Sequence, residues 1–214
     1  MLEQCVNWDS LVLASDVNEG TFIVDYIEFL FNTTIHYFNY ITTHSWIDTV
    51  SIPSQIRRGS GRVSNYMLKN KNETRVGVFG EVTSSKCQDD ERKIYWDIYR
   101  GAIHAKDFMD FNIRECGMHP DDATQIIIFI KGFYMEVCIL VLYHPGIYFL
   151  VEIESCNLPK SFRDLESIKK LYEVLMGIRK NSINFLSEKS QTQIDFSTWL
   201  RLTANTPNNS FVET

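Results

Sequence analysis

The chain has 214 residues, of which 44% are hydrophobic and 22% charged, a balance typical of a folded globular protein and not of a disordered one. Its 21 Lys and Arg against 27 Asp and Glu give a net charge of −6, which argues against a nucleic-acid binder that is basic over its whole surface and leaves room only for a local basic patch. At this length we expect one folded domain over residues 1–190, followed by a polar, flexible tail over residues 191–214.

Three features of the sequence bear on where the protein works. The N-terminal stretch MLEQCVNWDS lacks the basic start and apolar run of a signal peptide. The five cysteines are odd in number and have no metal-type spacing, which is typical of reduced thiols. Lys131, Glu136 and the turn HPG interrupt the apolar stretch 126–153, so no segment reaches the ~20 residues of a membrane span. We therefore expect an intracellular protein, cytoplasmic or nuclear, with no membrane contact.

Taken in chain order, the first predicted element is a helix over about residues 20–37. The stretch SDVNEGT supplies capping residues, and apolar residues follow at helical spacing. Residues 38–60 have mixed character and end in the loop SIPSQIRRGSG, where Pro53 and the Gly-Ser run break regular structure. RVSNYML and TRVGVFGEV are joined by the polar turn KNKN, which predicts an antiparallel hairpin.

The second half begins with a helix that opens at QDDER and carries an apolar stripe of Ile94, Ile98, Gly101, Ala105 and Phe108. TQIIIFI, FYMEVCILVLY and GIYFLVEIES follow as three strands, the first two apolar enough to be covered on both faces. A last helix begins near PKSFRDLES, where Ser161 and Asp164 have capping-box spacing, and its predicted buried stripe is Leu165, Ile168, Tyr172, Leu175 and Ile178. This order predicts an α/β fold with a mixed β-sheet flanked by helices.

Polar groups stand on both strands of the predicted hairpin. GRVSNYML carries Asn65, and FGEVTSSK carries Glu81. Oxygen ligands on neighbouring rigid strands can hold Mg²⁺, and a nearby lysine can stabilise charge that grows on a phosphate. Any Mg²⁺-dependent phosphodiesterase activity of this chain would therefore be expected at this pair of strands.

The order of elements and these two motifs resemble the PD-(D/E)XK nuclease superfamily. Together with LVLYHPGIYFLVEIESCNLP and the TPNN tail, they also resemble a large family of uncharacterised fungal proteins, over about residues 16–209. The resemblance implies a restriction-endonuclease-like core with an added C-terminal β-hairpin and helix. It also implies a site made of Pro-Asp on one strand and acid-x-Lys on the next.

Carried over by position, the Pro-Asp of the resemblance falls on Ser64 and Asn65, its second acid on Glu81 and its lysine on Thr83. Only Glu81 keeps the expected type of residue. Asn65 offers a metal a neutral carbonyl oxygen, and a threonine hydroxyl cannot replace an ammonium group. Asn65 and Glu81 are thus the candidate metal positions, with Mg²⁺ as the cofactor if the protein is active.

Two lysines could replace the missing one. Lys86 lies five residues past Glu81, and Lys93 lies on the following helix, so Glu81, Lys86 and Lys93 are the candidate catalytic residues. Lys93 shares one polar helix face with Asp97, Arg100 and His104, although such a face is ordinarily the solvent side of a helix. In the same way, a glutamate at a strand end is ordinarily a solvated or salt-bridged residue.

A basic cluster beside the first motif strand is the candidate nucleic-acid-binding surface; it consists of Arg57, Arg58 and Arg62, with Lys69 and Lys71 behind them. The alternative interpretation is a loop made soluble by its charges. The leading hypothesis is a catalytically degenerate nuclease-like domain, a pseudoenzyme that binds nucleic acid or protein. The alternatives are an active Mg²⁺-dependent DNA or RNA nuclease with a relocated lysine, and a protein-interaction scaffold that does not contact nucleic acid.

Overall fold

The computed structural model describes residues 17–36, 42–50, 63–72, 75–160 and 163–187. Within them the chain forms a mixed sheet of six strands that follow one another across the sheet in chain order, from β1 to β6. β3 and β4 are parallel, and every other neighbouring pair is antiparallel. The predicted α/β fold with a mixed sheet and helices is therefore confirmed at this level.

The strands are β1 (Thr42–Val50), β2 (Val63–Asn70), β3 (Val76–Thr83), β4 (Thr124–Lys131), β5 (Tyr134–His144) and β6 (Ile147–Asn157). The helices are α3 (Glu19–Phe22), the π-helical segment η1 (Ile23–Ile27), α4 (Glu28–Asn32), α6 (Glu91–Cys116) and α7 (Leu165–Ser187). Short 3₁₀ turns, η2 (Ser85–Cys87) and η3 (Pro120–Asp122), stand before α6 and β4.

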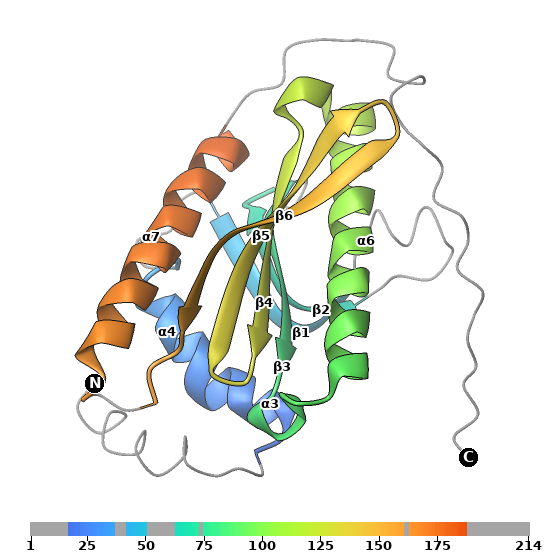
Figure 1. The fold of residues 1–214 in the computed structure, drawn as a ribbon. Coiled ribbons are helices and arrows are strands. Elements are labelled where there is room, and N and C mark those ends of the chain that lie inside the picture. Colours follow the sequence, from blue (N-terminus) through green and yellow to red (C-terminus); the bar gives the residue numbers. More distant parts are fainter. Residues whose placement is uncertain (1–16, 37–41, 51–62, 73–74, 161–162, 188–214) are drawn as a thin grey trace.

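Helices cover both faces of the sheet and create two apolar cores. α6 connects the parallel strands β3 and β4 and packs on one face, where Phe79, Phe108 and Phe129 are buried (Figure 1). α7 and the N-terminal helices pack on the other face, against side chains such as Val78 and Ile128. Because side chains alternate along a strand, the nearly continuous apolar runs of β3 and β4 serve both cores at once.

The first third of the described chain differs from the sequence predictions in two places. The N-terminal helix ends at Asn32 and not near residue 37, and Asn18 caps its start by accepting a hydrogen bond from the N–H of Thr21 at 2.9 Å. β1 lies within residues 38–60, which the sequence analysis assigned to no regular element. Among the described strands it lies at the edge and pairs only with β2. Its Thr, His and Ser residues hide the apolar alternation that identifies a strand.

The buried stripe of α7 is only partly as predicted. Leu165 and Tyr172 are 71% and 54% exposed, so their assignment to the core was wrong. The buried side chains near the middle of the helix are Leu171, Val174, Leu175 and Ile178. Asp164 caps the helix by accepting the N–H of Ser167 at 3.2 Å, whereas Ser161 lies outside the described residues.

α6 comes close to the sheet at Gly101, where an added Cβ would lie 2.8 Å from Cε1 of Phe129. That ring is buried and cannot move away freely. We expect Gly101→Ala to lower the free energy of unfolding by about 1–3 kcal/mol in a denaturant titration, because overpacking outweighs the better helix propensity of alanine. Gly177→Ala on α7 is the matched control, since no atom lies within 4 Å of its Cβ; it should raise stability by up to about 1 kcal/mol. Equal effects would contradict the close approach.

Candidate functional site

The two motif strands are aligned as the sequence predicts. Tyr66 of β2 pairs with Gly80 of β3, so Asn65 and Glu81 are neighbours across the ladder. Glu81 faces α6, and Asn65 shares its side of β2 with Met67, which belongs to the core under α6. Both candidate positions therefore lie on one face, at the end of the sheet where α6 begins.

The amide of Asn65 is fully engaged by the protein. Its Oδ1 accepts a hydrogen bond from the N–H of Val82 at 2.8 Å, and its Nδ2 donates to Oε1 of Glu19 at 3.0 Å. The bond from Val82 turns the amide oxygen toward the backbone of β3 and leaves one lone pair for any other partner. Asn65 thus serves here as a bridge between β2, β3 and α3.

Asp97 of α6 is the centre of the site. Its Oδ2 accepts hydrogen bonds from the hydroxyl of Thr83 at 2.7 Å and from Nζ of Lys93 at 3.0 Å. Its Oδ1 accepts one from Nη2 of Arg100 at 2.7 Å. Asp97 and His104 are both buried, so the interpretation of this helix face as the solvent side was wrong.

Glu81 lies under α6 and is only 2% exposed. Arg100 donates to its Oε2 at 3.1 Å, and Nδ1 of His104 lies 3.8 Å from its Oε1. Burial raises the pKa of Glu81 to about 8, because loss of hydration outweighs the attraction of Arg100. At neutral pH this carboxyl is therefore mainly protonated, which weakens it as a metal ligand.

Lys93 is the lysine that reaches the motif strands. Its Nζ lies 3.4 Å from Oγ1 of Thr83, 3.0 Å from Oδ2 of Asp97 and 3.1 Å from Oε2 of Glu19. Burial lowers the pKa of Lys93, but its hydrogen bonds with Asp97 and Glu19 raise it more, so the net pKa lies above the ordinary value. Lys86, the other candidate, is an exposed residue of the 3₁₀ turn η2.

Glu19 is the site residue that sequence reasoning missed. It lies in the first turn of α3 and joins two other site residues, Asn65 and Lys93, through its two carboxylate oxygens. In the sequence it belongs to a stretch that predicts only a helix start. No local signal connects it with residues 46 and 74 positions later; only the packing of α3 brings them together.

The site as arranged does not fit a divalent metal. Within the described part of the chain, no group of three or more His, Cys, Asp or Glu side chains could hold a metal ion. The ammonium of Lys93 stands between the carboxylates of Glu19 and Asp97, where a cation would otherwise be attracted. Mg²⁺ would have to displace this lysine before it could bind.

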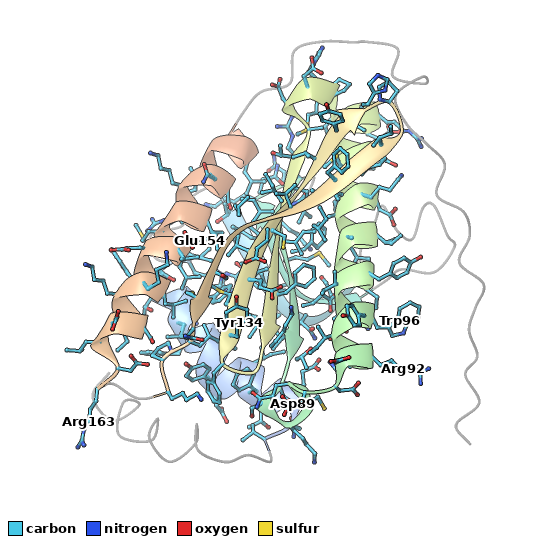
Figure 2. The ribbon with its side chains drawn as sticks, viewed as in Figure 1. Asp89, Arg92, Trp96, Tyr134, Glu154 and Arg163 are labelled. Atoms are coloured by element: carbon cyan, nitrogen blue, oxygen red, sulfur yellow. The ribbon has the colours of Figure 1, made fainter. Side chains whose placement is uncertain are left out.

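The predicted basic cluster can be placed only in part. Arg57, Arg58 and Arg62 lie outside the described residues. Val50 and Val63, the described residues on either side of the segment that carries these arginines, pair with each other. The chain therefore re-enters the sheet at Val63, two residues before Asn65. Next to the site, Arg92 and Trp96 project from α6 away from the sheet (Figure 2).

Comparison with family models gives no match, and neither the curated proteins nor the solved structures give one. A search of the described residues for membrane-spanning helices finds none that is long and apolar enough.

Proposed function

We propose that this chain is a catalytically degenerate nuclease-like domain, related to the restriction-endonuclease-like core and its fungal relatives, that binds nucleic acid or protein and does not cleave. In this proposal, β5, β6 and α7 include the C-terminal additions to that core. The observation that carries it is the network in which the protein's own cations neutralise the acidic groups of the site.

The charges of the network support a binding role. Glu19 and Asp97 share the ammonium of Lys93, and Arg100 bonds both Asp97 and Glu81. With Glu81 protonated, the two remaining carboxylates face two cations, and the formal charge of the set is zero. A phosphodiesterase that works with Mg²⁺ instead needs carboxylates whose charge is left for the metal.

A second candidate function is favoured by the position of Lys93. Its ammonium lies beside Thr83, the residue that takes the place of the nuclease lysine, so an active Mg²⁺-dependent nuclease with a relocated lysine is the alternative. Because its pKa is raised, Lys93 would act there by stabilising charge on a phosphate and not as a general base. Glu81 would have to lose its proton to the incoming metal.

Incubation with single- and double-stranded DNA and RNA in Mg²⁺ or Mn²⁺ separates the two functions. We expect no cleavage above that of a Glu81→Gln control. Metal-dependent cleavage that Glu81→Gln and Lys93→Met each abolish would overturn the degenerate function in favour of the nuclease.

Binding of nucleic acid is tested separately, by fluorescence anisotropy of a labelled oligonucleotide at several salt concentrations. If nucleic acid is the ligand, Arg57→Ala with Arg58→Ala should weaken binding about tenfold and flatten its salt dependence, because fewer counterions are released. As a control, Lys169→Ala combined with Lys170→Ala removes the same amount of charge from α7. This double change should alter neither the affinity for the oligonucleotide nor its salt dependence by much. Absence of binding at low salt would instead favour the protein-interaction scaffold.

A further inference from the structure

The hairpin of β5 and β6 carries an exposed apolar surface that the site does not use. Val141 of β5 pairs with Phe149 of β6, and Ile139 pairs with Val151. The rings of Tyr143 and Phe149 are in contact, with centroids 5.1 Å apart. We call this surface the hairpin face, and it consists of Ile139, Val141, Tyr143, Ile147, Phe149 and Val151.

The hairpin face is the continuation of the surface on which α7 packs. Ile139 pairs with Ile126, which packs against the core on the α7 side. The opposite side of the hairpin is closed, because Cys138, Leu140 and Leu142 belong to the core under α6. As far as the described residues go, the hairpin is thus covered on one side only.

The path of α7 explains why this helix does not cover the hairpin face. Near its start α7 lies beside the far end of β6, where Lys170 forms an ion pair with Glu154 at 3.1 Å. Near its end Leu186 lies against Gly77 of β3. The helix therefore crosses the sheet diagonally, from β6 toward β3 and β2, and the hairpin extends beyond it (Figure 1).

The hairpin face is comparable in size with the largest apolar patch of an ordinary monomer. Tyr143 is 72% exposed, and Ile147, Phe149 and Val151 are each 45–47% exposed. This amounts to roughly 500 Å² of apolar surface, within the range of the largest patch on an ordinary monomer, which is often functional. Two such surfaces in contact would bury about 1,000 Å², near the lower limit for a specific interface between proteins.

We propose that a second copy of this chain covers the hairpin face, hairpin against hairpin, about a twofold axis. The face contains no charged side chain, so its partner must present an equally uncharged apolar surface. The other exposed aromatic cluster among the described residues, Tyr95, Trp96 and Tyr99 of α6, stands among the charges of Arg92 and Glu91. Among the described surfaces, the hairpin face itself meets this requirement, and a twofold axis places equal patches opposite each other.

β6 adds a second reason for self-association. It is an edge strand of the sheet, with a strand neighbour on the β5 side alone among the described residues. The backbone groups of such an edge can pair with a strand of another chain unless charges or prolines protect it, so the edge of β6 can add to the contact between two hairpin faces. The stretch Ile147–Val151 has neither, whereas Glu152 and Glu154 protect the remainder of the strand.

The test is the molar mass of the full chain by light scattering after size exclusion, from about 5 to 200 μM. We expect the mass to rise toward twice that of the monomer with concentration. Phe149→Asp should shift the midpoint at least tenfold to higher concentration, because a carboxylate would be buried in an apolar contact. Tyr95→Asp, an equal change at an exposed aromatic residue on α6, should leave the midpoint unchanged.

Three outcomes would overturn the proposal. One is a monomer throughout the range, and another is an equal effect of the two aspartate variants. The third is a full chain that stays monomeric while a chain ending at residue 190 dimerises, since residues 191–214 would then cover the hairpin face. The thermal midpoint of Phe149→Asp, compared with that of Tyr95→Asp, checks that the monomer still folds.

Discussion

Replacement of Lys93 by Met is expected to lower the free energy of unfolding by about 2 kcal/mol at pH 7. The change leaves the buried carboxylate of Asp97 with one cation in place of two, and it breaks the link between α6 and Glu19. Removal of one partner from a fully buried ion pair costs about 3–5 kcal/mol, and we reduce this because the side chain of Lys93 is 31% exposed. Denaturant unfolding measures the loss.

Two controls make this result specific to the network. Lys169→Met removes an exposed lysine whose ammonium is 3.9 Å from Glu173, and it should change stability by less than about 0.5 kcal/mol. Lys93→Met combined with Asp97→Asn should cost less than the sum of the two single changes, by about 1 kcal/mol or more, since the residues are in direct contact. Additive effects would mean that Lys93 and Asp97 do not stabilise each other.

The second large effect concerns pH and Glu81. Its pKa in the folded protein, about 8, lies above the value of 4.5 for a free side chain, so folding favours the protonated form. The stability that comes from this group is fully present below pH 4.5 and is lost as pH rises toward 8. Over that window the contribution should fall by about 1.4 kcal/mol per pH unit at its steepest.

Glu81→Gln isolates this contribution, because glutamine keeps the shape of the protonated side chain and does not titrate. The stability of the wild type minus that of Glu81→Gln should decrease steadily between pH 5 and 8. Burial lowers the pKa of His36 to about 3, and this group gives the opposite trend, with stability lost as pH falls below 6.5. The effect of His36 is the same in the wild type and in Glu81→Gln, so it cancels in the difference between their stabilities. A constant difference, or one that increases with pH, would mean that Glu81 is charged in the folded state.

Local pattern was sufficient for the centre of the fold. The alternation in RVSNYML and TRVGVFGEV, with a polar turn between, correctly predicted the pairing of β2 with β3. The helix that opens at QDDER was also correct, since Asp90 caps it by accepting the N–H of Lys93. β1 was missed because its sequence, TTHSWIDTV, has Thr, His and Ser where apolar alternation would identify a strand.

The site was predictable only where it depends on the pairing of neighbouring strands or on spacing within one helix. Register placed Asn65 beside Glu81, and helical spacing placed Lys93 and Asp97 on one face. Whether that face is buried depends on how α6 lies on the sheet, which no local pattern reports. For the same reason the contact of Glu19 with Lys93 could not be foreseen, because it requires the position of α3 against both elements.

In the proposed function, the ammonium of Lys93 stands where a metal-dependent nuclease would hold its metal. Titration calorimetry with Mg²⁺ and Mn²⁺ tests it most directly, on the wild type, on Asn65→Asp alone and on Asn65→Asp combined with Lys93→Ala. Asn65→Asp puts a carboxylate about 3 Å from that of Glu19, and removal of the lysine leaves both charges to the metal.

We expect no binding heat for the wild type at millimolar metal and little for Asn65→Asp alone. The double variant should bind at least tenfold more tightly than either, and Glu81→Gln in that background should weaken it. Submillimolar binding to the wild type that depends on Glu81, or no gain in the double variant, would contradict the account.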